Sequence, residues 1–135
     1  MPRRPIYLLS DELVFPPAEW ARADGLLAVG GDLSVERLLL AYRSGIFPWP
    51  IADGDEVPLL WWAPTQRAII RPAELHVGRS LRKVARRGDY QIRYDTNFRE
   101  VITACSKAPR PGQAGTWIVP EMIEAYTKLH EAGYA

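Results

Sequence analysis

Five basic residues lie within nine positions of the chain, and no acidic residue lies among them. Arg79, Arg82, Lys83 and Arg86 follow the i, i+3, i+4, i+7 spacing of one helix face, and Arg87 extends that face. A helix face with this charge can bind phosphates through salt-sensitive contacts that do not depend on base sequence. The same pattern is also typical of a solvated helix face that binds nothing.

Tryptophan is concentrated in another part of the chain. Three of the five tryptophans, Trp49, Trp61 and Trp62, fall between Gly45 and Pro64, and Trp117 comes later. Exposed aromatic rings stack on unpaired bases, with about 1–3 kcal/mol per base, whereas buried rings fill a core. Together with the basic face, the rings favour binding of an RNA end or single strand over duplex DNA. Both interpretations of the tryptophans, platform and core, remain open at this point.

The composition is that of a globular protein and names no partner. The chain has 135 residues, 47% hydrophobic and 24% charged, with a formal net charge of +1. No apolar run is long enough to span a bilayer, and no targeting signal is visible, which favours the cytoplasm. The composition therefore predicts one domain or two small ones, with no membrane partner.

Few residues suggest catalysis or metal binding. The only cysteine, Cys105, excludes an intrachain disulfide, and we interpret it as a buried structural thiol. Without a recognisable motif around them, His76 and His130 are interpreted as structural or surface residues. The sequence shows no Gly-x-Ser-x-Gly and no His-Glu-x-x-His pattern. We predict no metal site and no cofactor.

Local signals predict four helices. Ser34 is a good N-cap for a helix over 35–44 that Gly45 ends. A second helix covers 79–87, ends at Gly88, and is expected to face inward through Leu81, Val84 and Ala85. A third helix is capped by Asp95 or Thr96, and its apolar face consists of Phe98, Val101, Ile102 and Cys105. A fourth helix begins at Pro120 and ends at Gly133.

Between the helices, short apolar or alternating runs predict strands. They cover residues 6–9, 25–29, 59–62, 67–71, 90–94 and 115–119. Residues 51–58 are interpreted as an acidic solvated loop. The fold class is therefore α+β, with a small N-terminal domain over 1–62 and a second α+β domain over 63–135.

Several segments, taken together, resemble the bacterial leucyl/phenylalanyl-tRNA–protein transferases. Trp61-Trp62-Ala63-Pro64 with Arg67 is similar to the family's Trp-Trp-Ser-Pro-x-x-Arg element, with alanine in place of serine. The other matching segments are 25–34, 37–39, 41–42, 45–49, 79–83, 115–118, 125–126 and 129–130. Their order and spacing make the combination specific, although no single segment is.

The resemblance implies an activity. Members of the family transfer leucine or phenylalanine, and less readily methionine, from aminoacyl-tRNA to the N-terminal Arg or Lys of acceptor proteins. The product is marked for N-degron proteolysis. No cofactor or metal is implied. The implied fold is a small N-terminal domain followed by an acetyltransferase-like (GNAT-type) domain.

The resemblance also assigns roles to residues of this chain. Trp49 and Trp117 would hold the 3′-terminal adenosine of the tRNA, and Tyr42 and Tyr126 would line or order that site. Arg79, Arg82, Lys83, Arg86 and Arg87 would contact the phosphates of the acceptor stem.

The resemblance covers the N-terminal 60% or so of the family. The family continues where this sequence stops, so residues 63–135 correspond to a partial acetyltransferase-like domain. The catalytic residues are expected in the C-terminal half, and none is identified here. We therefore expect this chain alone to be inactive, and the alternative is a non-catalytic tRNA-end-binding fragment.

Overall fold

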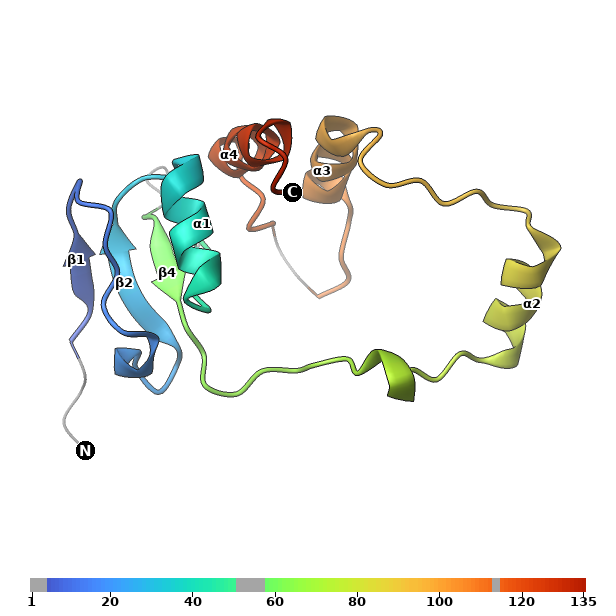
Figure 1. The fold of residues 1–135 in the computed structure, drawn as a ribbon, viewed down its shortest axis with the longest axis horizontal. Helices are drawn as coiled ribbons and strands as arrows, with labels where there is room; N and C mark the ends of the chain where they lie inside the picture. Colours follow the sequence, from blue (N-terminus) through green and yellow to red (C-terminus); the bar gives the residue numbers. More distant parts are fainter. Residues whose placement is uncertain (1–4, 51–57, 113–114) are drawn as a thin grey trace.

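The computed structural model describes residues 5–50, 58–112 and 115–135, and these form a mixed α+β fold (Figure 1). One mixed sheet has the strand order β1-β2-β4-β3. Its strands are β1 (Tyr7–Leu9), β2 (Leu26–Gly30), β3 (Phe47–Pro48) and β4 (Leu60–Trp62). Strands β1 and β2 are parallel, while β4 is antiparallel to both β2 and β3. The predicted acidic loop 51–58 lies almost wholly outside the described residues.

All four predicted helices are present. They are α1 (Val35–Arg43), α2 (Arg79–Arg87), α3 (Phe98–Lys107) and α4 (Pro120–Glu131). The Ser34 hydroxyl accepts a hydrogen bond from the Arg37 amide at 3.3 Å, as an N-cap does. Gly45 follows α1 with φ of +70°, a conformation that favours glycine. The N-cap of α3 is Asn97 rather than Asp95 or Thr96, and its side chain makes no cap hydrogen bond.

Three of the predicted strands are wrong. Residues 67–71, 90–94 and 115–119 belong to no strand of the structure. A strand exists only where a neighbouring strand completes its backbone hydrogen bonds. The described part of the chain offers these segments no such neighbour.

Two predictions of burial are also wrong. Leu81 and Ala85 of α2 are exposed and Val84 is only partly buried, because no described segment packs on that helix. Cys105 is exposed rather than buried, because α3 contacts α4 along one side and leaves the face that carries Cys105 in solvent. Val101 of the same predicted apolar face is exposed as well.

Trp61 lies at the centre of the hydrophobic core. Its side chain is fully buried, and it pairs with Ala28 of β2 on one side and Pro48 of β3 on the other. The indole N–H donates to the carbonyl of Gly30 at 2.8 Å, and the ring of Phe15 meets the indole edge-on. Apolar residues of α1 and α4 complete this core, among them Leu38, Ala41, Ala125 and Leu129. Trp61 therefore fills the core, which settles the platform-or-core question for this residue.

Arg37 is a second buried anchor, and it is charged. Its guanidinium donates to the carbonyls of Ser10 and Glu12, both at 3.0 Å, and to the Asp32 carboxylate at 3.3 Å. Hydrogen bonds from Ser34, together with the nearby Arg37 charge, lower the pKa of Asp32. A Cβ added to Gly31 would lie 3.2 Å from the guanidinium, so this turn needs glycine. Arg37 thus joins the N-terminal segment to α1.

A long segment of the described chain lies away from this core. From β4 the chain runs out to α2 and returns to α3, and Figure 1 shows α2 far from the sheet. None of the helices in the described ranges is long and apolar enough to cross a membrane.

Substitution Trp61→Phe is expected to lower the free energy of unfolding by about 1–3 kcal/mol, because it leaves a cavity and removes the indole hydrogen bond to the partly buried Gly30 carbonyl. A fall of the urea midpoint at unchanged slope would measure this loss. Trp20→Phe is the matched control, because Trp20 is half-exposed. Equal midpoints for both variants would contradict the central role of Trp61.

Candidate functional site

The four aromatic residues predicted to bind adenosine come together in one cluster. Trp49 follows β3, Trp117 precedes α4, Tyr42 lies on α1 and Tyr126 on α4. The Trp117 ring meets the Tyr126 ring edge-on with centroids 6.2 Å apart, and Tyr126 meets Tyr42 in the same way at 6.4 Å. We call these four residues the aromatic cluster. Their roles toward a ligand stay predictions.

Hydrogen bonds hold the backbone of Trp49 in place. Its amide donates to the Leu60 carbonyl at 2.9 Å, and its own carbonyl accepts from the Trp62 indole N–H at 2.9 Å. The flanking Pro48 and Pro50 are buried, while 42% of Trp49 is exposed. The Trp61-Trp62 dipeptide therefore has two tasks, since Trp61 fills the core and Trp62 orients Trp49.

The two tyrosine hydroxyls of the cluster are hydrogen-bonded to each other, across 84 residues of sequence. Burial and this hydrogen bond raise the pKa of Tyr126 well above its usual range. The phenol of Tyr126 is therefore neutral throughout the physiological pH range. It can donate or accept one hydrogen bond, but it cannot serve as a base there.

A hollow of about 300 Å³ opens beside the cluster. It is lined by Tyr42, Gly45, Ile46, Phe47, Pro48, Trp49, Arg67 and Trp117. The Arg67 guanidinium donates to the carbonyls of Gly45 and Pro64 and lies 5.8 Å from the centre of the Phe47 ring. Sequence reasoning assigned no role to Arg67, although its place in the Trp-Trp-Ala-Pro-x-x-Arg element was a signal. Among the described residues that line this hollow, Arg67 brings the one positive charge.

Trp49 and Trp117 are stacked on each other in this structure. Their ring centroids are 5.1 Å apart and their planes differ by 22°. A base between them would need two stacking contacts, or roughly 7 Å from ring to ring. A base can therefore lie between these rings only after they separate. Trp49 also lines a second hollow of about 350 Å³, together with Trp62 and Phe47.

The five predicted phosphate-binding residues also share one place. Arg79, Arg82, Lys83, Arg86 and Arg87 line a single open hollow of about 410 Å³ on α2. Arg87 pairs with Asp89 at 2.8 Å, and within the described ranges the other four form no ion pair. Figure 1 places α2 far from α1 and α4, so the basic face and the aromatic cluster are separate surfaces of this structure.

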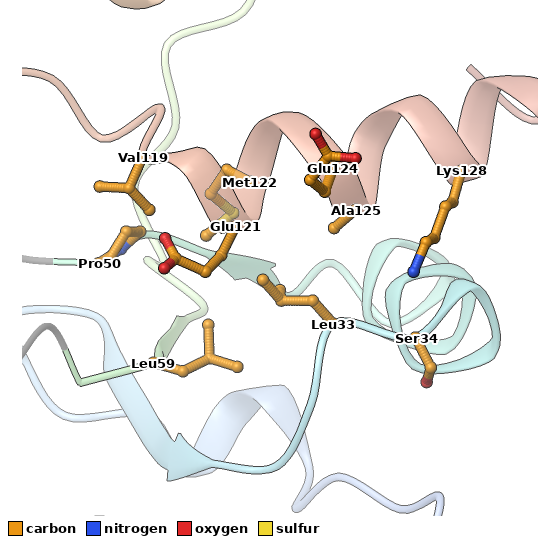
Figure 2. A pocket seen from close by; sticks show the side chains of 10 residues that line it. All are labelled: Leu33, Ser34, Pro50, Leu59, Val119, Glu121, Met122, Glu124, Ala125 and Lys128. Atoms are coloured by element: carbon orange, nitrogen blue, oxygen red, sulfur yellow. The ribbon is translucent and has the colours of Figure 1, made fainter.

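A larger cavity among the described residues, about 680 Å³, was not predicted from the sequence. It lies between α4 and the sheet, where Leu33, Leu59 and Met122 give an apolar lining and Glu121 and Lys128 add charged groups (Figure 2). Glu124 also lines this cavity, and its carboxylate accepts a hydrogen bond from the Arg99 guanidinium of α3. This hydrogen bond lowers the pKa of Glu124. Pro50 and Leu59 also line the cavity. Size alone would favour this cavity, but the converging polar and aromatic groups favour the cluster as the candidate site.

Among the described residues, no group of three or more His, Cys, Asp or Glu side chains is placed to hold an ion. Neither histidine lines the hollow beside the cluster. The ring of His130 stacks on Phe98 with centroids 4.5 Å apart. His76 is exposed on the segment before α2.

Comparison with known families identifies the chain. Residues 69–135 match the model described as leucyl/phenylalanyl-tRNA protein transferase, and residues 31–65 match the model of the N-terminal domain of that transferase. The chain belongs to the leucyl/phenylalanyl-tRNA–protein transferase family. The N-terminal match ends at residue 65 and the other begins at residue 69, on either side of Arg67. Through its hydrogen bonds to the Gly45 and Pro64 carbonyls, Arg67 ties the start of the segment that leads to α2 to the β3–β4 region.

Individual members of the leucyl/phenylalanyl-tRNA–protein transferase family are similar over nearly all of this chain. The transferase of Myxococcus xanthus is 62% identical over 133 residues, which cover 97% of this chain and 56% of the relative. That of Oleidesulfovibrio alaskensis is 53% identical over 130 residues, which cover 96% of this chain and 51% of the relative. The chain thus spans about half the length of the curated transferases it matches.

The stacked tryptophan pair predicts a spectroscopic signal. Two indoles at this distance couple excitonically, so the far-ultraviolet circular dichroism should show a couplet of opposite signs. Trp117→Phe should abolish the couplet, whereas Trp20→Phe should leave it. A spectrum of the unmodified chain without a couplet, or a couplet that Trp117→Phe leaves unchanged, would contradict the stack of Trp49 and Trp117.

Proposed function

We propose that this chain serves aminoacyl transfer from tRNA to protein. Leucine or phenylalanine, and less readily methionine, moves from its tRNA to the N-terminal Arg or Lys of an acceptor protein in the cytoplasm. The modified protein is thereby marked for N-degron proteolysis. The single observation that carries this proposal is the aromatic cluster, assembled by β3, α1 and α4 in a chain of this family.

In the proposed reaction the α-amine of the acceptor attacks the ester carbonyl of the aminoacyl-tRNA. A carbon–nitrogen bond forms, the ester carbon–oxygen bond breaks, and the ribose hydroxyl leaves with a proton. This chain supplies binding rather than chemistry, because its cluster offers stacking surfaces and a neutral Tyr126 phenol. The groups that move the proton lie, in this proposal, outside the 135 residues.

For tRNA binding, we assign the 3′-terminal adenosine to Trp49. The base would take the place of Trp117 on the Trp49 ring, and the Trp117 ring would then cover its other face. Tyr126 and Tyr42, whose hydroxyls are hydrogen-bonded to each other, would line one edge of the opened site. Arg79, Arg82, Lys83, Arg86 and Arg87 would contact acceptor-stem phosphates, which allows one protein to accept several tRNAs.

The domain organisation follows the same proposal. Residues 1–62 form the small N-terminal domain, and residues 63–135 are the first half of an acetyltransferase-like (GNAT-type) domain. The second candidate function is a non-catalytic protein that binds tRNA ends. It is favoured by the absence of a general base from the aromatic cluster, whose titratable members are two phenols bonded to each other.

The adenosine assignment predicts that affinity depends on the last nucleotide of the tRNA. Intact leucyl-tRNA should bind about tenfold or more tightly than tRNA without its terminal adenosine, since stacking contributes about 1–3 kcal/mol per base. Trp49→Ala should remove this preference, and the half-exposed Trp20→Ala should retain it. Equal affinity of the intact and shortened tRNAs for the unmodified chain would disprove the assignment.

The same samples separate the two candidate functions. Labelled leucine is offered on its tRNA together with a peptide that begins with arginine, and an N-acetylated peptide is the control. We expect the chain alone to bind tRNA without transferring leucine. Transfer by the chain alone would mean that the catalytic groups lie within these 135 residues.

The basic face predicts a change in salt dependence. Lys83→Glu should weaken binding of all tRNAs alike, and should reduce the slope of log K against log salt by about one for each phosphate that is no longer neutralised. Lys107→Glu is the matched control, because Lys107 is also an exposed lysine of a helix but lies on α3. If both variants bind with the slope of the unmodified chain, α2 does not contact the phosphates.

A further inference from the structure

Arg67 is held in place by contacts that use only part of its guanidinium. Its Nε–H donates to the Pro64 carbonyl at 3.1 Å, and an Nη2–H donates to the Gly45 carbonyl. A guanidinium carries five N–H donors, so three of them remain. Within residues 5–50, 58–112 and 115–135, these three donors have no hydrogen-bond or ion-pair partner. Arg67 is therefore fixed and still able to bind an anion.

The surroundings of Arg67 stabilise its charge before any ligand binds. Gly45 follows the C-terminal end of α1, where helix carbonyls favour a cation. The guanidinium also lies 5.8 Å from the centre of the Phe47 ring, close enough for a cation–π contact. A side chain that is already held in this way loses little conformational freedom when a ligand binds.

The hollow beside the aromatic cluster favours an anion next to Arg67. The guanidinium shares this hollow of about 300 Å³ with Trp49 and Trp117, and no acidic residue is among its described lining residues. Arg67 also lines a neighbouring hollow of about 430 Å³, but Glu19 lines that hollow as well. A carboxylate there opposes a second negative charge, so the hollow with the tryptophans is the better site for an anion.

An exposed indole and a fixed guanidinium in one hollow match the two ends of a nucleotide. A base can stack on the Trp49 ring, of which 42% is exposed. The phosphate of the same nucleotide lies one ribose away from the base. A planar guanidinium can donate two parallel hydrogen bonds to phosphate oxygens. The basic face of α2 cannot make this contact in the present structure, because α2 lies far from the cluster (Figure 1).

We propose that Arg67 binds the 5′-phosphate of the nucleotide whose base stacks on Trp49. In a tRNA, this phosphate joins the terminal adenosine to the nucleotide before it. The inference rests on the proposed function, because it requires a nucleotide at Trp49. Held at its base and at its phosphate, the terminal nucleotide has one orientation, and its ribose hydroxyls have one position. Arg67 is thus a positioning residue, since it touches the phosphate and none of the reacting atoms.

Small probes test the phosphate contact without the rest of a tRNA. Adenosine and adenosine 5′-monophosphate are titrated against the chain, and tryptophan fluorescence is measured. The monophosphate should bind about tenfold more tightly than adenosine, as expected for hydrogen bonds to a charged group. Adenosine 5′-methyl phosphate, which carries one charge like the tRNA diester, should also bind more tightly than adenosine.

Arg67→Gln should abolish the advantage of the monophosphate and leave the affinity for adenosine unchanged. Arg71→Gln is the matched control, because Arg71 is an exposed arginine that pairs with Glu74 and lines neither hollow. The control variant should retain the full difference between the two probes. A loss of packing around Arg67 would weaken both probes alike, whereas loss of the phosphate contact weakens only the monophosphate.

A second measurement uses the unmodified chain, because Arg67→Gln also removes two hydrogen bonds to backbone carbonyls. Phenylglyoxal modifies exposed guanidinium groups, and mass spectrometry of the digested chain locates the modified arginines. At equal occupancy of the site, the monophosphate should slow the modification of Arg67 more than adenosine does. Modification of Arg71 should proceed equally with both probes.

Two results would overturn the role of Arg67 alone. They are an advantage of the monophosphate that survives Arg67→Gln, and equal protection of Arg67 by both probes. Failure of the proposed function has a different signature, because adenosine would then bind the unmodified chain no better than it binds the Trp49→Ala variant. In that case both proposals fall, whereas the first two results leave the assignment of adenosine to Trp49 standing.

Discussion

The burial of Trp61 is the constraint on which the rest of this structure depends. One indole fills the space between the sheet and the helices, and its N–H completes the hydrogen bonding of Gly30. Because Trp61 pairs with both β2 and β3, its position fixes where β3 ends. The next residue, Trp62, then bonds the Trp49 carbonyl. Core packing and site geometry are thus set by two adjacent side chains.

The aromatic cluster is assembled by long-range packing. Its members come from two helices, the end of a strand and an irregular segment, and both α1 and α4 pack on the Trp61 core. The cost of burying the Tyr126 phenol is offset by its hydrogen bond to Tyr42. The same hydrogen bond holds Tyr42 and Tyr126 in place beside Trp49 and Trp117, whose rings must separate to admit a base.

Local signals predicted the helices well, because their causes lie within a few residues. Ser34 and Gly45 bound α1, Gly88 ends α2, and Pro120 begins α4. The family was also predictable, because the Trp-Trp-Ala-Pro-x-x-Arg element and its companions are specific in combination. The sequence predicted strands at 67–71, 90–94 and 115–119 that the structure does not contain. A strand needs a neighbouring strand, and the sequence alone does not show whether one is present. The direct Trp49–Trp117 stack and the exposure of Cys105 likewise depend on packing between distant segments.

The packing of α4 on α1 has a consequence for the chain between them. It closes a loop that contains the whole segment 67–97, and loop-closure entropy grows only with the logarithm of length. Each doubling of such a loop costs about 0.6 kcal/mol. Insertions or deletions near α2 would therefore change the stability of the Trp61 core very little. The surface that carries the basic face can diverge in length and composition while the part of the fold that holds the aromatic cluster stays the same.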